Sequence, residues 1–160
     1  MYRKNRTAGS IPRPGEGKRG PEGHLGYLVR QANVAVRAAM EKALADLEVT
    51  PPQFAVLTMI VAYPGLSGAD LARLTFLTPQ TINVIVRNLV RSGAVEKSAH
   101  AVHGRILRLN ATARGEALLR RCRARVNELE ERIAGLLSRD EERVVRRWLG
   151  AVGEKLAEEC

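Results

Sequence analysis

The stretch TPQTINVIVRNLVRSG, residues 78–93, decides the fold of this chain. Its large apolar side chains recur three, one and three residues apart, as on one face of an α-helix; they are Ile82, Ile85, Val86 and Leu89. Thr78 is a good N-cap, Pro79 suits the first helical position, and Gly93 is a common residue just beyond a helix end. The stretch therefore predicts one amphipathic helix with sharp ends.

A second short helix is predicted immediately before this one. Ser67 and Asp70 stand three residues apart, as in a capping box, and Leu71 and Leu74 are its expected inward side chains. Only residues 75–77 separate the two helices. Two short capped helices joined by a tight turn are the core of a helix-turn-helix.

The outward side of the helix over residues 78–93 carries amides, hydroxyls and arginines, and residues 71–95 contain no Asp or Glu. In a helix-turn-helix the second helix enters the major groove, where amides pair with adenine and methyl groups contact thymine. A solvated surface helix is the alternative, but it would carry more Glu and Lys. The predicted DNA contacts of the two helices are Ser67, Thr78, Gln80, Thr81, Asn83, Val84, Arg87 and Arg91.

Two short strands, residues 94–97 and 105–109, are expected around a loop over residues 98–104. A hairpin directly after the second helix is the wing of a winged helix-turn-helix. Arg105 at the base of this loop is a predicted DNA contact, because the narrow minor groove attracts arginine. The alternative is an ordinary basic strand residue.

The N-terminal half divides into three predicted segments. Residues 1–23 are rich in Gly, Pro, Arg and Lys and predict a disordered basic tail, either an arm that contacts phosphates or a solubilising extension. Residues 24–47 predict a long first helix that takes part in dimerisation. Residues 48–110 form the winged helix-turn-helix lobe, which begins with a helix capped by Thr50.

Residues 111–160 predict two antiparallel helices for dimerisation, because their apolar residues alternate at spacings of three and four. A seam of this kind on so small a domain is expected to meet a second copy of the chain. Packing within one subunit is the alternative. The predicted dimer residues are Leu119, Cys122, Val126, Leu129, Ile133, Leu149, Val152 and Leu156.

Composition agrees with a mainly α chain carrying a small β-hairpin, an α+β arrangement. Of 160 residues, 45% are hydrophobic but 4% are aromatic, which favours a core of packed aliphatic helices. The net charge is +9, and residues 67–125 hold +8 of it, from eleven basic and three acidic residues. This positive block suits double-stranded DNA as partner. No apolar run suggests a membrane segment, so a cytoplasmic protein is expected.

Residues 24–158 resemble the MarR family of bacterial regulators. The resemblance rests on the order of elements, on residues 89–95 leading into the wing, and on residues 105–115 ending Thr-Ala-Arg-Gly. The family's wing carries Asp-x-Arg, and this chain has His103-Gly104-Arg105 in that place. The resemblance implies a ligand-responsive repressor that is a homodimer on pseudo-palindromic operators, with a small-molecule crevice between the DNA-binding lobe and the dimer helices.

Single features of the sequence are also compatible with other functions. A nucleic-acid-binding protein without sequence choice, of nucleoid or RNA-binding type, fits the charge as well. A metal site could be formed by the imidazoles of His100 and His103, together with Glu96 or His24. The spacing is weak evidence for such a site, so no metal or other cofactor is predicted. Cys122 is either a redox switch or a small buried hydrophobe. No motif of an enzyme is present, so none is predicted.

Overall fold

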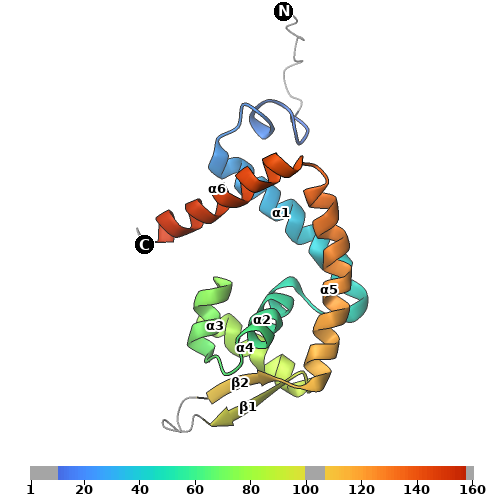
Figure 1. Cartoon of the computed structure of the whole chain (residues 1–160), viewed down its shortest axis with the longest axis vertical. Coiled ribbons are helices and arrows are strands. Elements are labelled where there is room, and N and C mark those ends of the chain that lie inside the picture. Colours follow the sequence, from blue (N-terminus) through green and yellow to red (C-terminus); the bar gives the residue numbers. More distant parts are fainter. Residues whose placement is uncertain (1–10, 100–106, 158–160) are drawn as a thin grey trace, which may run out of the picture. The chain divides into compact units, whose positions relative to one another are not determined.

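The computed structural model describes residues 11–99 and 107–157, and the chain forms two compact units, residues 1–39 and 40–160. The elements drawn in Figure 1 are, in chain order, η1 (Gly17–Arg19), α1 (Leu25–Leu44), η2 (Ala45–Leu47), α2 (Pro51–Ala62), α3 (Gly68–Thr75), α4 (Pro79–Arg91), β1 (Val95–Ala99), β2 (Leu107–Ala111), α5 (Ala113–Ala134) and α6 (Arg139–Ala157). The predicted mainly helical chain with one β-hairpin is confirmed.

The first unit joins the short 3-10 helix η1 to the N-terminal part of α1. Gln31 and Arg19 exchange two hydrogen bonds of 3.1 Å, and the Arg19 guanidinium also donates to the carbonyl of Pro12 at 2.8 Å. Residues 11–23 were expected to belong to a disordered tail. That expectation is wrong for this part of the chain, because the polar side chain of Gln31 supplies partners that composition does not reveal.

The core of the second unit gathers α2, α3, α4, the hairpin and the first turns of α5 around one apolar cluster (Figure 1). Its largest fully buried side chains are Val56, Leu57, Ile60, Leu71, Ile82 and Leu119. All four predicted inward residues of α4 are buried, which confirms the helical period. Leu74 is 41% exposed, so its predicted inward position in α3 is wrong. Leu71 is the buried residue of this eight-residue helix, and Ala72 packs against the core beside it.

The hairpin packs on this core through β2. Strands β1 and β2 are antiparallel, with Val95 opposite Ala111 and Ala99 opposite Leu107. Leu109 also exchanges backbone hydrogen bonds with the segment before α3: its NH donates to Leu66 and its carbonyl accepts from Gly65, both at 3.0 Å. The strands were predicted correctly, with ends displaced by one or two residues.

A second apolar cluster places α5 against the end of α1 and the connection to α2. Leu44, Val49, Cys122 and Val126 are its buried members. Cys122 and Val126, together with Leu119 in the main core, are therefore covered within one chain, and their assignment to a dimer seam is wrong. The heptad spacing that suggested a second copy is satisfied here by the chain's own α1–α2 region.

Burial also decides between the two roles considered for Cys122. Its side chain is fully buried, and this desolvation raises the pKa of the thiol above its ordinary value of 9.0. A thiol that stays protonated at neutral pH reacts slowly with oxidants. Cys122 therefore acts as a small hydrophobe of the core.

Helix α6 differs from α5 because its apolar residues stay accessible within one chain. Val144, Val145, Trp148, Leu149 and Leu156 are each between 36% and 56% exposed. Among the residues described, no single helix is long and apolar enough to cross a membrane. The stretches 25–47 and 51–62 meet that test only as a pair bent by 78°, and the second stretch is the core helix α2.

Gly115 allows α5 to approach the start of β1. A Cβ atom at this position would overlap the backbone carbonyl of Ala94. Thr112 caps α5 at the same place, accepting from the NH of Gly115 at 3.1 Å and donating to the carbonyl of Gly93 at 2.6 Å. Because Gly115 has no side chain, the start of α5 packs directly against the residue that precedes β1.

We expect Gly115→Ala to lower the free energy of unfolding by about 1–3 kcal/mol, because backbone must move to admit the methyl group. Urea denaturation followed by circular dichroism measures this change. Gly150→Ala is the matched control, since nothing lies within 4 Å of a Cβ there. It should raise the stability by about 0.5–1 kcal/mol, and a neutral Gly115→Ala would contradict the close approach.

Candidate nucleic-acid interface

The capping box of α3 orders the residues that precede the helix-turn-helix. The Ser67 hydroxyl accepts from the backbone NH of Asp70 at 3.2 Å and donates to the Asp70 carboxylate at 2.6 Å, and the Ser67 NH donates to the same carboxylate at 3.1 Å. Arg73 donates to the other carboxylate oxygen at 3.0 Å. Ser67, a predicted DNA contact, thus has a structural role whatever else it contacts.

These bonds stabilise the ionised form of Asp70. The hydroxyl and the backbone NH of Ser67 lower the pKa of this carboxyl below its ordinary value of 3.8, and the charge of Arg73 adds to the effect. The carboxylate is therefore neutralised locally by its own turn. It is the acidic residue of α3, and α4 has none.

Helix α4 begins with Thr78, whose hydroxyl oxygen accepts from the backbone NH of Thr81 at 3.2 Å. The two threonine hydroxyls also lie 2.9 Å apart and share a hydrogen bond. With Pro79 at the first position and no acidic residue in the first turn, the N-terminal end of α4 keeps its positive dipole unopposed. Such an end attracts a phosphate group.

The outward face of α4 consists of the residues predicted for it. Gln80, Asn83, Val84, Arg87 and Arg91 are exposed, and Thr81 is half-buried. Val84 is 54% exposed, while the neighbouring Ile85 is 6% exposed, so the boundary between the two faces is sharp. The structure brings these side chains together on one accessible surface.

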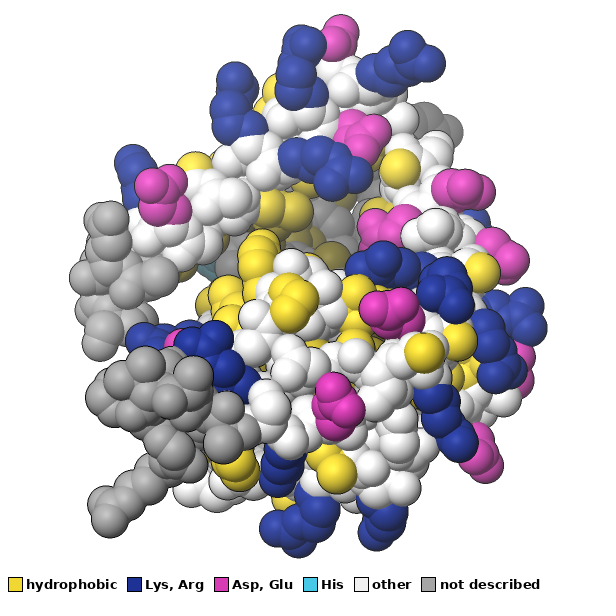
Figure 2. Space-filling model, turned by 60° about the horizontal axis from the view of Figure 1, so that its bottom comes forward, with side chains coloured by type: hydrophobic (Ala, Val, Ile, Leu, Met, Phe, Trp, Pro, Cys, Tyr) yellow, Lys and Arg dark blue, Asp and Glu magenta, His cyan; other side chains and the backbone are white. Residues whose placement is uncertain are grey.

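The arginines of α4 differ in their surroundings. Arg91 donates to the side-chain oxygen of Asn88 at 3.0 Å, whereas Arg87 makes no ion pair or hydrogen bond within the part of the chain that the structure describes. In Figure 2 dark-blue Lys and Arg side chains lie along the lower edge of the face drawn, where acidic side chains are few. An unpaired guanidinium on an accessible face suits a phosphate or a guanine edge.

The wing is described only in part. Lys97 on β1 and Arg108 on β2 are exposed beside the core-facing Leu109. Arg105, His100 and His103 lie outside the described residues, so their predicted roles stay predictions. Among the residues that are described, no group of three His, Cys, Asp or Glu could hold a metal ion.

Comparison with known proteins places this geometry in a family. Residues 47–106 match the sequence profile of the MarR family. The HTH-type transcriptional repressor Rv2887 of Mycobacterium tuberculosis is 38% identical over 129 residues, which cover 81% of this chain and 93% of the repressor. This chain belongs to the MarR family.

Solved structures agree with that assignment. The MarR-family protein Rv2887 in complex with p-aminosalicylic acid superimposes with a TM-score of 0.68 at 36% identity, covering 82% of this chain and 99% of that one. The repressor CouR bound to a 23-mer DNA duplex gives a TM-score of 0.76 at 25% identity, covering 81% and 92%. The MarR-type winged helix, with α4 as the second helix and β1–β2 as the wing, is thereby confirmed.

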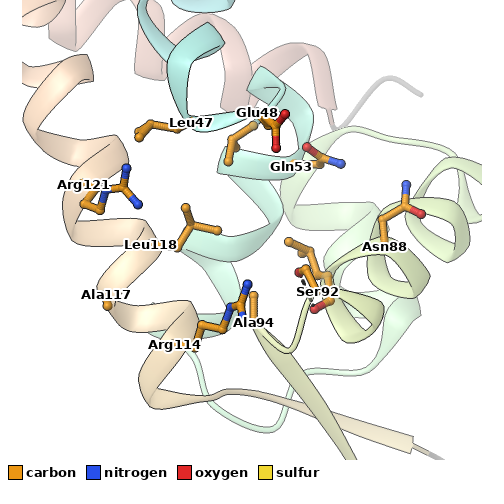
Figure 3. A pocket seen from close by; sticks show the side chains of 12 residues that line it. Leu47, Glu48, Gln53, Asn88, Ser92, Ala94, Arg114, Ala117, Leu118 and Arg121 are labelled. Carbon is orange, nitrogen blue, oxygen red and sulfur yellow. Dashed lines mark hydrogen bonds between the residues drawn. The ribbon is translucent and has the colours of Figure 1, made fainter.

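The sequence did not predict which side chains of α5 lie close to the end of α4 and line a pocket of about 390 Å³ there (Figure 3). Asn88 belongs to α4 but turns its side-chain oxygen to Arg91, and Arg114 and Arg121 lie on α5 close to the end of α4. The helical period assigns each residue to a side of its own helix, but it says nothing about which distant helix that side will meet.

We expect Asp70→Asn to lower the free energy of unfolding at pH 7 by about 0.5–1 kcal/mol, through loss of the charged half of the capping box. A lowered pKa in the folded state stabilises the protein above pH 3.8, and this contribution is lost as the pH falls through the folded value. The difference between parent and variant should therefore shrink in acid, as measured by urea denaturation at several pH values.

Asp140→Asn is the control, because Asp140 is an exposed carboxylate that pairs with Arg143 three residues on. Exposed pairs of this kind contribute little. A pH-independent deficit in Asp70→Asn, equal to that of the control, would show that the Ser67–Asp70 bonds do not hold in solution.

Proposed function

We propose that this chain is a transcriptional repressor that binds operator DNA as a homodimer and responds to a small molecule. The observation that carries the proposal is the outward face of α4: amides, hydroxyls and arginines on a capped helix without a carboxylate. Its membership in the MarR family and its similarity to the repressor Rv2887 support the same function. A structure of Rv2887 with DNA, 34% identical to this chain, supports DNA as the partner.

The proposed contacts divide by chemistry. Gln80 and Asn83 present amides that pair with an adenine edge, and Val84 presents methyl groups to a thymine methyl. Thr78, Thr81 and Ser67 lie at the two helix starts, where hydroxyls and backbone NH groups contact phosphates. Arg87, Arg91 and, in the wing, Arg105 add positive charge for phosphates, bases or the minor groove.

The accessible apolar side of α6 supports a homodimer. Leu149 and Leu156 are 47% and 56% exposed, and Val152 is half-buried between them in the sequence. Apolar side chains exposed along one side of a helix mark a surface that another protein surface covers. We propose that a second copy covers these three residues and that Ile133 at the end of α5 adjoins them. Leu129, which was predicted with them, is only 7% exposed within one chain and contributes little to such a surface.

The proposal also includes ligand response, location and lack of catalysis. The structures of Rv2887 with salicylic acid and with p-aminosalicylic acid favour small aromatic acids as effectors of the family. A regulator of DNA acts in the cytoplasm of a bacterium and needs no catalytic group. A nucleic-acid-binding protein without sequence choice is the second candidate, favoured by the positive charge of residues 67–125.

Asn83→Ala should weaken binding to an operator, selected from random duplexes, by about 5- to 150-fold, because one amide–base pair contributes about 1–3 kcal/mol. Binding to random duplex should stay nearly the same. Fluorescence anisotropy with both duplexes at fixed salt measures the two affinities, and Arg87→Ala should weaken both and reduce the salt slope by about one.

Arg147→Ala, on the far side of α6 from Leu149, is the control for the loss of a charge and should leave both affinities unchanged. Equal affinity of the parent for operator and random duplex would contradict sequence choice and favour the second candidate.

Leu149→Asp should convert the homodimer to a monomer and abolish operator binding, since two recognition helices must reach two half-sites. Light scattering after size exclusion measures the mass. Arg147→Asp, which introduces the same side chain on the opposite side of the helix, should remain a dimer. A parent protein that is monomeric at micromolar concentration would refute the proposed assembly.

A further inference from the structure

Two of the described residues other than glycine have a left-handed backbone conformation, and one of them lies in the turn between α3 and α4. Phe76 has φ 55° and ψ 34° and follows the last residue of α3. Glu48, before α2, has nearly the same angles, φ 54° and ψ 32°. This conformation strains any residue that has a Cβ atom, because the Cβ crowds a backbone carbonyl, whereas glycine adopts it freely.

The backbone of the turn is fixed on both sides of Phe76. The NH groups of Phe76 and Leu77 both donate to the carbonyl of Ala72, the second at 3.2 Å. The Thr75 hydroxyl donates to the carbonyl of Leu71 at 2.6 Å, and Leu77 packs against the main core. The neighbours of Phe76 therefore hold the turn, and its own side chain is not needed for this.

The side chain of Phe76 is 94% exposed, the largest value for any large hydrophobic residue that the structure describes. A single exposed apolar residue is ordinary on a protein surface. A phenyl ring exposed on a strained backbone is less ordinary, because glycine at this position would relieve the strain and leave no apolar surface in water. Since neither feature stabilises the chain, the two together indicate a contact outside it.

The surroundings of Phe76 favour DNA as the partner. Phe76 precedes Thr78, the N-cap of α4, by two residues, so their Cα atoms lie within about 7 Å of each other. The ring therefore adjoins the helix end that attracts a phosphate. Residues 71–95 carry no Asp or Glu, and the carboxylate of Asp70 pairs with Arg73 at 3.0 Å. The surface around Phe76 is thus continuous with the proposed DNA face of α4 and does not repel a polyanion.

We propose that Phe76 packs on the sugar–phosphate backbone of the operator at the edge of the major groove, an inference that rests on the proposed function. The ring covers deoxyribose carbons next to the phosphate at the start of α4. Because the backbone of the turn is already fixed, ordering the ring on DNA costs only the freedom of its own two torsion angles.

The nature of this contact gives it a recognisable signature. A contact between a phenyl ring and a sugar involves no charge, so it adds affinity without adding to the salt dependence of binding. A sugar is also the same at every base pair, so the gain in affinity is independent of sequence. Arg87 differs in the first respect, since its charge contributes to the salt dependence, and Asn83 differs in the second.

The test compares Phe76→Gly with the parent in two measurements on the full chain. Thermal unfolding should show a melting temperature about 2–4 °C higher, because relief of the strain outweighs the added freedom of the unfolded chain. Fluorescence anisotropy should show about 5- to 20-fold weaker binding to both the selected operator and random duplex, with an unchanged salt slope. Phe76→Tyr, which keeps the ring, should bind both duplexes as the parent does.

Glu48→Gly is the matched control, because Glu48 shares the backbone angles of Phe76 but lies before α2, outside the helix-turn-helix. It should raise the melting temperature in the same way and leave both affinities within about twofold of the parent. Ile11→Ala removes another apolar side chain that is 84% exposed and should change neither affinity. A Phe76→Gly variant that loses affinity for the operator alone would place the ring on a base and overturn the sugar contact.

A photoreactive side chain identifies directly what the ring contacts. With p-benzoylphenylalanine in place of Phe76, irradiation of the operator complex should crosslink the protein to DNA. Crosslinks to a second copy of the chain alone would assign Phe76 to an interface between protomers and overturn the DNA contact.

Failure of this inference differs from failure of the proposed function. A parent that prefers the operator, together with a Phe76→Gly variant of equal affinity, overturns the ring contact and leaves the proposed function standing. A parent that binds no duplex refutes the proposed function and the ring contact with it.

Discussion

The packing of one side of α4 into the lobe core is the constraint on which the rest of this structure depends. Ile82, Ile85, Val86 and Leu89 are all at most 6% exposed, held among residues of α2, α3 and β1. Burying four aliphatic side chains supplies several kcal/mol of stabilisation. Because the buried side is fixed, the opposite side with its amides and arginines is presented outward in one orientation.

Helix α5 belongs to that core more than its sequence suggests. Gly115 permits contact with Ala94, Leu119 fills the main cluster, and Cys122 and Val126 fill a second one. These contacts occupy the first half of the helix. The DNA-binding lobe therefore includes the start of α5.

The positive charge of the central block serves several local purposes. Arg73 and Arg125 neutralise carboxylates, whereas Arg87 on α4 and Arg114 and Arg121 on α5 have no anionic partner among the described residues. The sequence reveals the sum of these charges, and the structure separates them into an outward DNA face and a pocket behind it. The outward face supports the proposed operator binding.

The sequence by itself determined what depends on near neighbours. The caps at Thr50, Ser67, Thr78 and Thr112, the inward residues of α4 and the position of the hairpin all follow from spacings of a few residues, since a helix turn and a strand pair are local. Tertiary structure alone decided what covers each apolar stripe. The spacing of Leu119, Cys122 and Val126 is the same whether the covering surface is another copy or this chain's own α1–α2 region, and only the folded core shows that it is the latter. For the same reason the residues that line the pocket between α4 and α5 could not be predicted, because its walls come from segments that only folding brings together.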